Sequence, residues 1–217
     1  MDSSREDLRE ALKRVAVALK RAEIPFALTG GYAIWARGGP EPDHDVDFLI
    51  AREDVERAVE SLVEQGLEVV RPPEDWLVKV FTDNAMVDLI HRHSDAPAER
   101  ATVEDADVFE VLSVQMPVLS ATEVVVQKML ALNEHHCDFA AMIAVMRALR
   151  EQLDLARVRR ETAQSPFAAA LLLLLERLDV IEPEGGPVAG HGGVPVGSAD
   201  RLAADGKASR AKRRQPR

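Results

Sequence analysis

Residues 28–50, LTGGYAIWARGGPEPDHDVDFLI, constrain the fold of this chain more than any other segment. An apolar run leads into Gly30 and Gly31, a short helical pattern follows, and a second apolar run then carries Asp45 and Asp47. Side chains alternate across a β-strand, so two carboxylates at positions i and i+2 face the same side. Two like charges at this spacing repel each other unless a cation lies between them, and carboxylate oxygens suit Mg²⁺ or Mn²⁺. The segment therefore predicts a metal-dependent site for phosphoryl-group chemistry.

The composition is that of a globular protein with one substantial core. The chain has 217 residues, of which 47% are hydrophobic and 29% charged, which is enough for one core and a small second lobe. Cys137 is the only cysteine, which excludes an internal disulfide, and the start MDSSREDLRE has no apolar leader. The longest apolar run, Phe167 to Leu175, is too short to span a bilayer. We therefore expect a protein of the reducing cytoplasm with no membrane partner.

Basic residues are concentrated at the C-terminal end. Residues 207–217, KASRAKRRQPR, hold six of the 27 Lys and Arg and no acid. Residues 1–206 are left with 21 basic against 37 acidic residues, a net charge of −16. An acidic body repels a nucleic-acid duplex, so this tail is the segment with the charge to contact nucleic acid. The alternative interpretation of the tail is a solvated extension without a partner.

The hydrophobic pattern of the first 119 residues predicts an α/β (α+β) fold. A helical pattern over 4–22 is followed by strand and helix patterns in alternation, which is typical of a sheet covered by helices. The predicted strands are 26–29, 45–51, 67–71, 76–82 and 85–91. The predicted helices between the first three strands are 31–37 and 53–65.

From residue 120 the pattern is helical. Ser120 and Glu123 form a capping-box signature at the start of the first helix. Further helical stretches lie near 136–150, 153–163 and 166–179. After Pro183 the chain is rich in Gly, Pro and small residues and then basic, so it buries too little apolar surface to become ordered. The predicted division is an α/β domain over 1–119, a helical lobe over 120–182 and a disordered tail over 183–217.

A third acid lies inside an apolar run. Asp88 is flanked by apolar residues in MVDLI, where an unpaired charge is costly and needs a partner. If the apolar runs on either side of Asp83 and Asn84 form a hairpin, Asp88 lies on a strand beside the one with Asp45 and Asp47. Three carboxylates then converge on one or two cations. This arrangement activates a hydroxyl and holds a nucleoside triphosphate (NTP) in line for attack.

Gly30 and Gly31 suit a phosphate group. Without Cβ atoms they let backbone amides approach an anion closely, and the helix that follows directs its positive end toward that anion. Arg37, at the end of this helix, is a candidate to supply positive charge to the triphosphate. The alternative is an exposed arginine that only favours the helix C-terminus.

At these residues the chain resembles the nucleotidyltransferases of the DNA polymerase beta superfamily, in particular the small bacterial branch with antibiotic nucleotidyltransferases and AbiEii-type toxins. The runs LTGGYAIWARGG, HDVDFLI and MVDLI carry the resemblance, which covers residues 24–140. It implies a mixed sheet flanked by helices. It also implies that Asp45, Asp47 and Asp88 bind the catalytic metals and that Asp88 acts on the attacking hydroxyl. Gly30 and Gly31 would contact the triphosphate.

The resemblance to the toxin branch implies two further residues, a lysine on a later helix and an acid beyond it, which match Lys128 and Asp138. Lys128 lies among apolar residues, so it either contacts phosphate or extends its ammonium group to water. Many members have Gly-Ser where this chain has two glycines, so a serine hydroxyl that helps to hold phosphate is missing.

His91 and His93 lie at strand spacing, which is more typical of a solvated strand end than of a zinc site.

These features predict a metal-dependent nucleotidyltransferase. It moves a nucleoside monophosphate from an NTP, with Mg²⁺ or Mn²⁺, onto a hydroxyl of a small molecule, an RNA or a protein, as a resistance-type or toxin–antitoxin enzyme. The alternative is a non-catalytic nucleotide- or partner-binding module that keeps the same fold. Convergence of Asp45, Asp47 and Asp88 on a shared cation distinguishes the enzyme from the module.

Overall fold

The computed structural model describes residues 3–93 and 96–184. The described residues up to Pro183 belong to one compact unit. The predicted disordered tail over 183–217, with its basic end, lies outside the described residues except for Pro183 and Glu184. The division between residues 119 and 120 stays a prediction.

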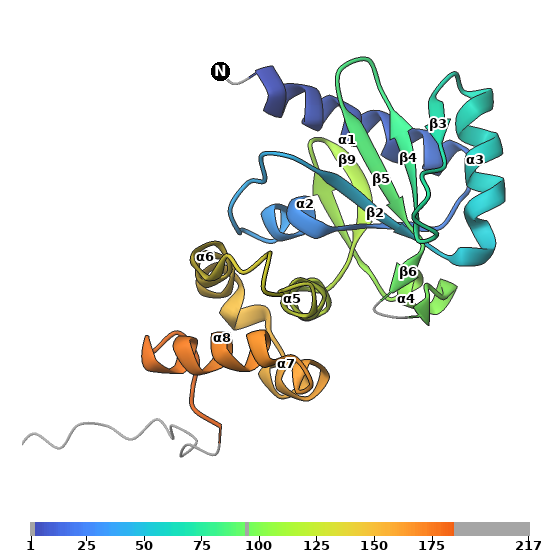
Figure 1. Cartoon of the computed structure of the whole chain (residues 1–217). Coiled ribbons are helices and arrows are strands. Elements are labelled where there is room, and N and C mark those ends of the chain that lie inside the picture. The colour runs from blue at the N-terminus through green and yellow to red at the C-terminus, as the bar shows by residue number, and fades with distance from the viewer. Residues whose placement is uncertain (1–2, 94–95, 185–217) are drawn as a thin grey trace, which may run out of the picture. The chain divides into compact units, whose positions relative to one another are not determined.

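This unit contains a mixed seven-stranded sheet with strand order β3-β4-β5-β2-β1-β9-β8 (Figure 1). Its strands are β1 (Phe26–Thr29), β2 (Val46–Ile50), β3 (Glu68–Val70), β4 (Leu77–Phe81), β5 (Met86–Ile90), β8 (Asp107–Val111) and β9 (Val114–Val118). The β2–β5 and β1–β9 pairs are parallel, and the other pairs are antiparallel. A separate ribbon pairs β6 (Arg92–His93) with β7 (Ala96–Pro97). The predicted α/β (α+β) class and the five predicted strands are confirmed.

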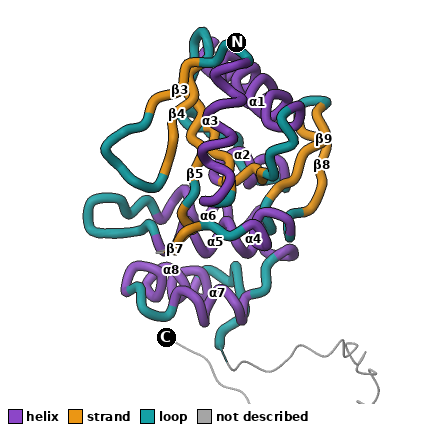
Figure 2. The backbone as a smooth tube through the Cα atoms, turned by 90° about the vertical axis from the view of Figure 1, so that its right-hand side faces the viewer, coloured by secondary structure: helices purple, strands orange, loops and turns teal. Residues whose placement is uncertain are grey.

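Helices cover the sheet and continue beyond it (Figures 1 and 2). They are α1 (Ser3–Arg21), α2 (Gly30–Ala36), α3 (Val55–Glu64), α4 (Arg100–Glu104), α5 (Ala121–Leu130), α6 (Phe139–Leu149), α7 (Leu155–Thr162) and α8 (Pro166–Arg177), with short 3₁₀ turns η1 (Arg52–Asp54) and η2 (Arg150–Gln152). Each of the last four helices begins after a side chain that accepts a hydrogen bond from the first turn. These caps are Ser120, Asp138, Asp154 and Ser165. The predicted N-cap at Ser120 is confirmed, since its hydroxyl accepts from the amide of Glu123.

The hairpin of β8 and β9 and the short helix α4 were not predicted. The two turn residues of the hairpin, Leu112 and Ser113, have φ values of 51° and 65°. Such a turn usually carries Gly, Asn or Asp, so its sequence gave no hairpin signal. The edge strand β8 is also largely exposed and lacks the alternating apolar pattern of a half-buried strand.

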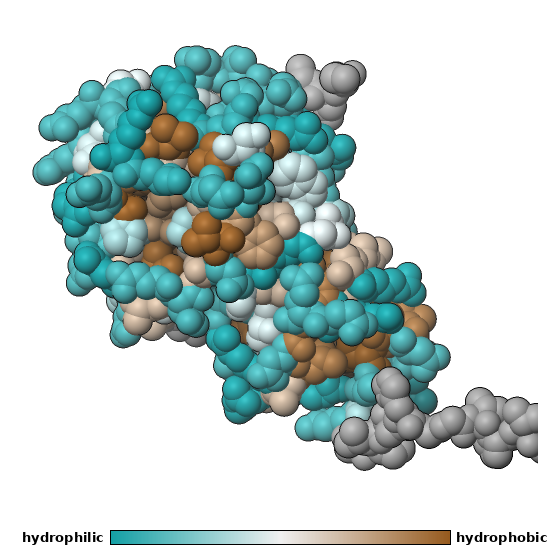
Figure 3. All heavy atoms as spheres, turned by 180° about the vertical axis from the view of Figure 1, so that it is seen from behind, coloured by the Kyte–Doolittle hydropathy of each residue, from teal (hydrophilic) through white to brown (hydrophobic). Residues whose placement is uncertain are grey.

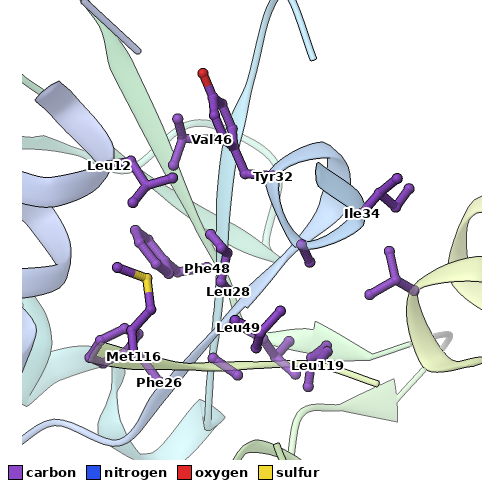
Figure 4. Packing of buried hydrophobic residues seen from close by; sticks show 14 of the residues in the cluster. Leu12, Phe26, Leu28, Tyr32, Ile34, Val46, Phe48, Leu49, Met116 and Leu119 are labelled. Carbon is purple, nitrogen blue, oxygen red and sulfur yellow. The ribbon is translucent and has the colours of Figure 1, made fainter. Parts of the chain in front are cut away.

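One face of the sheet packs against α1. Leu12 of α1 lies against Phe48 of β2, and Figure 4 shows both in one cluster with Val46 and Met116. The rings of Phe26 and Phe48 meet edge to face with centroids 5.3 Å apart. Burial of each such aromatic side chain contributes roughly 1.5–3 kcal/mol to folding. Because side chains alternate along a strand, Asp47, which lies between Val46 and Phe48, points to the opposite face of the sheet.

The C-terminal helices continue from the sheet through α5. Helix α5 contacts α2 and α7, and α7 contacts α8 (Figures 1 and 2). Helix α8 buries Ala168, Leu171 and Leu175 and leaves Leu173 54% exposed. Figure 3 shows hydrophobic residues at the surface of this part of the chain. Among the helices in residues 3–93 and 96–184, none is long and apolar enough to cross a membrane.

Candidate functional site

Four polar residues form a row across one face of the sheet. We call two residues register partners when they lie opposite each other in adjacent strands. Asp47 of β2 is the register partner of Thr29 in β1 and of Asp88 in β5. Asp88 is in turn the register partner of Lys79 in β4. Register partners point to the same face, so all four side chains lie on the face opposite α1.

The row confirms the predicted arrangement of the strands. The β4–β5 hairpin turns at Asp83 and Asn84, and β5 lies beside β2 as expected. Asp45 precedes β2 and is exposed, two residues before Asp47. Asp47 and Asp88 are thus brought together by the pairing of β2 with β5. Asp45 lies directly before the first residue of β2.

Gly30 makes room for the carboxylate of Asp47. Gly30 has a φ of +61°, and a Cβ atom at this position would lie 2.0 Å from Oδ2 of Asp47. Gly31 is also crowded, because a Cβ there would lie 2.7 Å from Cβ of Pro42. The absence of side chains at both positions is therefore a steric requirement of this site. Contact of the two glycines with a phosphate stays a prediction.

Burial and two neighbouring carboxylates raise the pKa of Asp47. The pKa of Asp47 is raised from 3.8 to about 7, first by burial and then by the charges of Asp45 and Asp88. The positive charges of Lys128 and Lys79 lower this pKa. A carboxyl group with so high a pKa gains stability when a cation approaches it. The site therefore favours the binding of a positive ion.

Lys79 is paired with Asp88, and we did not predict this contact from the sequence. Its Nζ donates to Oδ1 of Asp88 at 3.1 Å and to Oδ2 at 3.4 Å. The two side chains are 27% and 15% exposed. Burial raises the pKa of Asp88, and the hydrogen bond from Lys79 opposes that shift. A signal was present: both charges lie inside apolar runs, at equal distances on either side of the hairpin turn.

A pocket of about 430 Å³ opens beside Asp45 and Asp47. Lys128 of α5 lies in its wall and lowers the pKa of Asp47. The wall also has an apolar part, made by Ile34 of α2 and Val145 of α6. A pocket with carboxylates, one ammonium group and an apolar side suits a phosphate-bearing organic ligand.

The loop of residues 38–45, which leads into β2, is tied to α1. Arg9 donates to Glu41 through Nε at 2.7 Å and through Nη2 at 2.8 Å. Arg5 pairs with Asp43 in the same loop. The guanidinium group of Arg9 also lies over the ring of Trp35, 5.6 Å from its centroid. The loop that forms one wall of the pocket is therefore fixed by side chains from the first helix.

Two predicted site residues, Arg37 and Asp138, do not line this pocket. Arg37 is only 6% exposed and donates to the carbonyl oxygen of Leu119 at 2.7 Å and to Asp107 at 2.9 Å. Its guanidinium group is used to hold the β8–β9 hairpin, so it is neither exposed nor in the pocket wall. Asp138 is exposed and accepts a hydrogen bond from the amide of Ala141 as the N-cap of α6.

His91 is buried, which corrects the expectation of a solvated strand end. It is 4% exposed, and Nη1 of Arg52 lies 3.1 Å from its Nδ1. The segment after β7 lies beside the backbone of His91, since the amide of Ala98 donates to the carbonyl oxygen of His91. Burial lowers the pKa of His91, and the charge of Arg52 lowers it further.

The carboxylates fit one divalent cation in part. Across residues 3–93 and 96–184, no group of three or more His, Cys, Asp or Glu side chains is placed to hold a metal ion. Asp45 and Asp47 share a pocket wall and supply the hard oxygen donors that Mg²⁺ or Mn²⁺ prefers. Asp88 is engaged by Lys79. Binding of a metal by all three acids stays a prediction.

The mixed sheet, the glycine turn and the aligned strand carboxylates define a protein of the nucleotidyltransferase class. Residues 3–184 match the model of a family described as "uncharacterised nucleotidyltransferase", and the chain belongs to this family. It is therefore an enzyme of the nucleotidyltransferase type, as the sequence predicted. A comparison with curated proteins finds no match.

Solved structures of antibiotic nucleotidyltransferases have a similar fold. ANT(2'')-Ia in complex with adenylyl-2''-tobramycin is 14% identical, with a TM-score of 0.50 over 76% of this chain and 97% of that chain. The solution structure of the same resistance factor is 15% identical, with a TM-score of 0.51 over 82% of this chain and 99% of that chain. The lincosamide adenylyltransferase LnuA, bound to lincomycin, is 10% identical, with a TM-score of 0.46 over 63% and 94%. The first two comparisons establish the fold.

Proposed function

We propose that this chain is a metal-dependent nucleotidyltransferase that transfers a nucleoside monophosphate from an NTP to a hydroxyl group and releases pyrophosphate. The alignment of Asp47 and Asp88 in adjacent parallel strands carries this proposal. It places two carboxylates on one face of the sheet, and the pocket with Asp45 and Lys128 adjoins Asp47. Family membership supports the reaction class.

Each residue of the site has a distinct role in this proposal. Asp45 and Asp47 hold Mg²⁺ or Mn²⁺, and the ion, when bound, neutralises charge on the phosphate oxygens. Lys128 supplies a positive charge to the triphosphate from α5. Asp88 accepts the proton of the attacking hydroxyl. The apolar side of the pocket excludes water from the nucleobase of the NTP or from the acceptor molecule.

We propose ATP as the donor to test first and small hydroxylated antibiotics as the first acceptors. One structure of similar fold contains an adenylylated tobramycin, which supports the choice of aminoglycosides. An RNA end or a protein hydroxyl remains in the acceptor panel. We assign the reaction to the cytoplasm, where NTPs and Mg²⁺ are abundant.

The test is incubation of the protein with each α-³²P-labelled NTP, Mg²⁺ or Mn²⁺, an aminoglycoside panel and a cell extract. The unaltered protein is compared with Asp47→Asn, which removes charge with little change of volume. Asp83→Asn is the matched control, since Asp83 is 91% exposed in the β4–β5 turn. We expect labelled product with the unaltered protein and the control and none with Asp47→Asn.

Unchanged turnover in Asp47→Asn would refute the mechanism. Nucleotide binding without transfer to any acceptor would instead favour the non-catalytic binding module. In the productive case, the labelled fraction identifies the acceptor class as small molecule, RNA or protein.

A further inference from the structure

We propose that Lys79 is the resident counter-cation of Asp88, so that Asp45 and Asp47 alone recruit the divalent ion and Asp88 is reserved for the acceptor hydroxyl. The inference rests on the proposed function and specifies how the three acids of that site divide their work. It makes Lys79 a positioning residue, because it acts through Asp88.

The contact between Lys79 and Asp88 is built into the sheet. The two residues are register partners in the antiparallel β4–β5 hairpin, which turns tightly between Phe81 and Met86. The residues next to Lys79, Val78 and Val80, are buried on the other face of the sheet. A slip of the hairpin by one residue would expose these valines, so the hydrophobic pattern itself fixes the ammonium group opposite Asp88.

The ammonium group contacts both oxygens of Asp88, at 3.1 and 3.4 Å. A divalent ion that approached Asp88 from this side would meet a positive charge at short range, which is unfavourable. Because Lys79 contacts both oxygens of Asp88, this carboxylate has a fixed orientation on the face of the sheet that it shares with Asp47. One oxygen lone pair at a fixed position is what proton transfer from a hydroxyl requires.

Asp45 and Asp47 have no such contact. In the described part of the chain, neither carboxylate is hydrogen-bonded to a basic side chain. Lys128, in the wall of the same pocket, affects Asp47 only through its charge. The two carboxylates therefore remain open to a divalent ion, whereas Asp88 already has a cation.

Mn²⁺ binding without turnover tests this division. Free Mn²⁺ is titrated into the full chain and followed by its EPR signal, for the unaltered protein, for Lys79→Met and Lys79→Arg, and for the double variant Lys79→Met/Asp88→Asn, which removes the ion pair without a change of net charge. Lys13→Met is the matched control, since it removes a lysine from an ion pair with Glu10 on the outer helix α1. Circular dichroism verifies that each variant is folded.

We expect Lys79→Arg, the control and the double variant Lys79→Met/Asp88→Asn to bind Mn²⁺ within about threefold of the unaltered protein, because each of them keeps the net charge beside Asp47 or lies away from it. Lys79→Met frees Asp88, and we expect its Mn²⁺ affinity to rise by about tenfold or a second ion to bind. An affinity that falls by about tenfold in the double variant Lys79→Met/Asp88→Asn would overturn the inference, since Asp88 would then be a ligand. An unchanged affinity in folded Lys79→Met would overturn it too.

If Lys79→Met does not fold, the double variant Lys79→Met/Asp88→Asn, which leaves no unpaired charge, decides. Failure of the inference and failure of the proposed function are distinct outcomes. Mn²⁺ binding that depends on Asp88 overturns only the role of Lys79. No Mn²⁺ binding by the unaltered protein, with and without ATP, contradicts the metal-dependent function and the inference together.

Discussion

Asp47 in β2 and Asp88 in β5 lie opposite each other in adjacent parallel strands, although α3, β3 and β4 separate them along the chain. A parallel pair needs a long crossover, and α3 supplies it. The β4–β5 hairpin then returns the chain to β2. Both carboxylates are therefore placed by strand pairing, which gives a more rigid placement than a loop would.

The first prediction concerns the pH dependence of stability. The folded pKa of Asp47 is about 7 against an ordinary value of 3.8, so between these values the native state binds a proton more readily than the unfolded chain. The contribution of this group to stability is then greatest at low pH and declines as the pH rises to about 7, by up to about 1.4 kcal/mol per pH unit. We expect metal-free Asp47→Asn to lack this decline and to exceed the unaltered protein in stability above about pH 7.

Urea unfolding in the presence of EDTA, repeated from about pH 4 to about pH 8, measures this difference. Asp83→Asn again serves as the control and should keep the pH dependence of the unaltered protein, because Asp83 is exposed. Parallel pH curves for Asp47→Asn and the unaltered protein would contradict the raised pKa.

The arrangement of the central strands could be predicted because each strand has a clear signal. Asp45 and Asp47 mark one strand, and the Asp83–Asn84 turn pairs the run before it with the run that carries Asp88. The β8–β9 hairpin could not be predicted in this way. Its turn at Leu112 and Ser113 is imposed by tertiary packing and not by residues that prefer positive φ.

The direction of a long side chain was harder to predict than the position of a strand. Arg37 follows α2, as expected, but its guanidinium group lies 4.6 Å from the centroid of the Phe109 ring. Phe109 belongs to the β8–β9 hairpin, for which the sequence has no turn signal, so the contact between Arg37 and Phe109 could not be predicted. Lys79 was missed for a related reason, because its role depends on its register with Asp88.

The second prediction separates steric fit from backbone strain at the glycines. Gly30→Ala places a methyl group on the carboxylate of Asp47 at a φ of +61°. Gly66→Ala is the matched control, since Gly66 has a φ of +78° with no atom within 4 Å of the added Cβ. We expect each variant to lose about 1 kcal/mol or more of stability from strain. We expect only Gly30→Ala to lose transfer activity and Mn²⁺ binding. Equal activities of the two variants would contradict a steric role of Gly30 beside the carboxylate of Asp47.

The third prediction assigns triphosphate binding to Lys128. Lys128→Met keeps the length of the side chain and removes its charge from the pocket wall. We expect the affinity for ATP to fall by about tenfold and the affinity for Mn²⁺ alone to be retained or increased, because Lys128 opposes the charge of Asp47. Isothermal titration calorimetry measures both affinities. Unchanged ATP affinity in this variant would show that Lys128 does not bind the triphosphate.

The last prediction concerns the loop of residues 38–45. Arg9→Ala removes the paired hydrogen bonds to Glu41 and the cation over Trp35, and it leaves the Arg5–Asp43 pair between this loop and α1. We expect faster amide hydrogen exchange over residues 38–45 and a weaker nucleotide affinity, by about threefold, because one pocket wall is less well positioned.

Arg14→Ala is the matched control on the same helix. Arg14 is exposed and forms an ion pair with Asp83 at 3.2 Å, away from the loop. Hydrogen exchange followed by mass spectrometry should show faster exchange in residues 38–45 for Arg9→Ala only. If exchange in the loop is unchanged and nucleotide affinity still falls, Arg9 acts on the nucleotide directly and the loop is held by Arg5 and Asp43 alone.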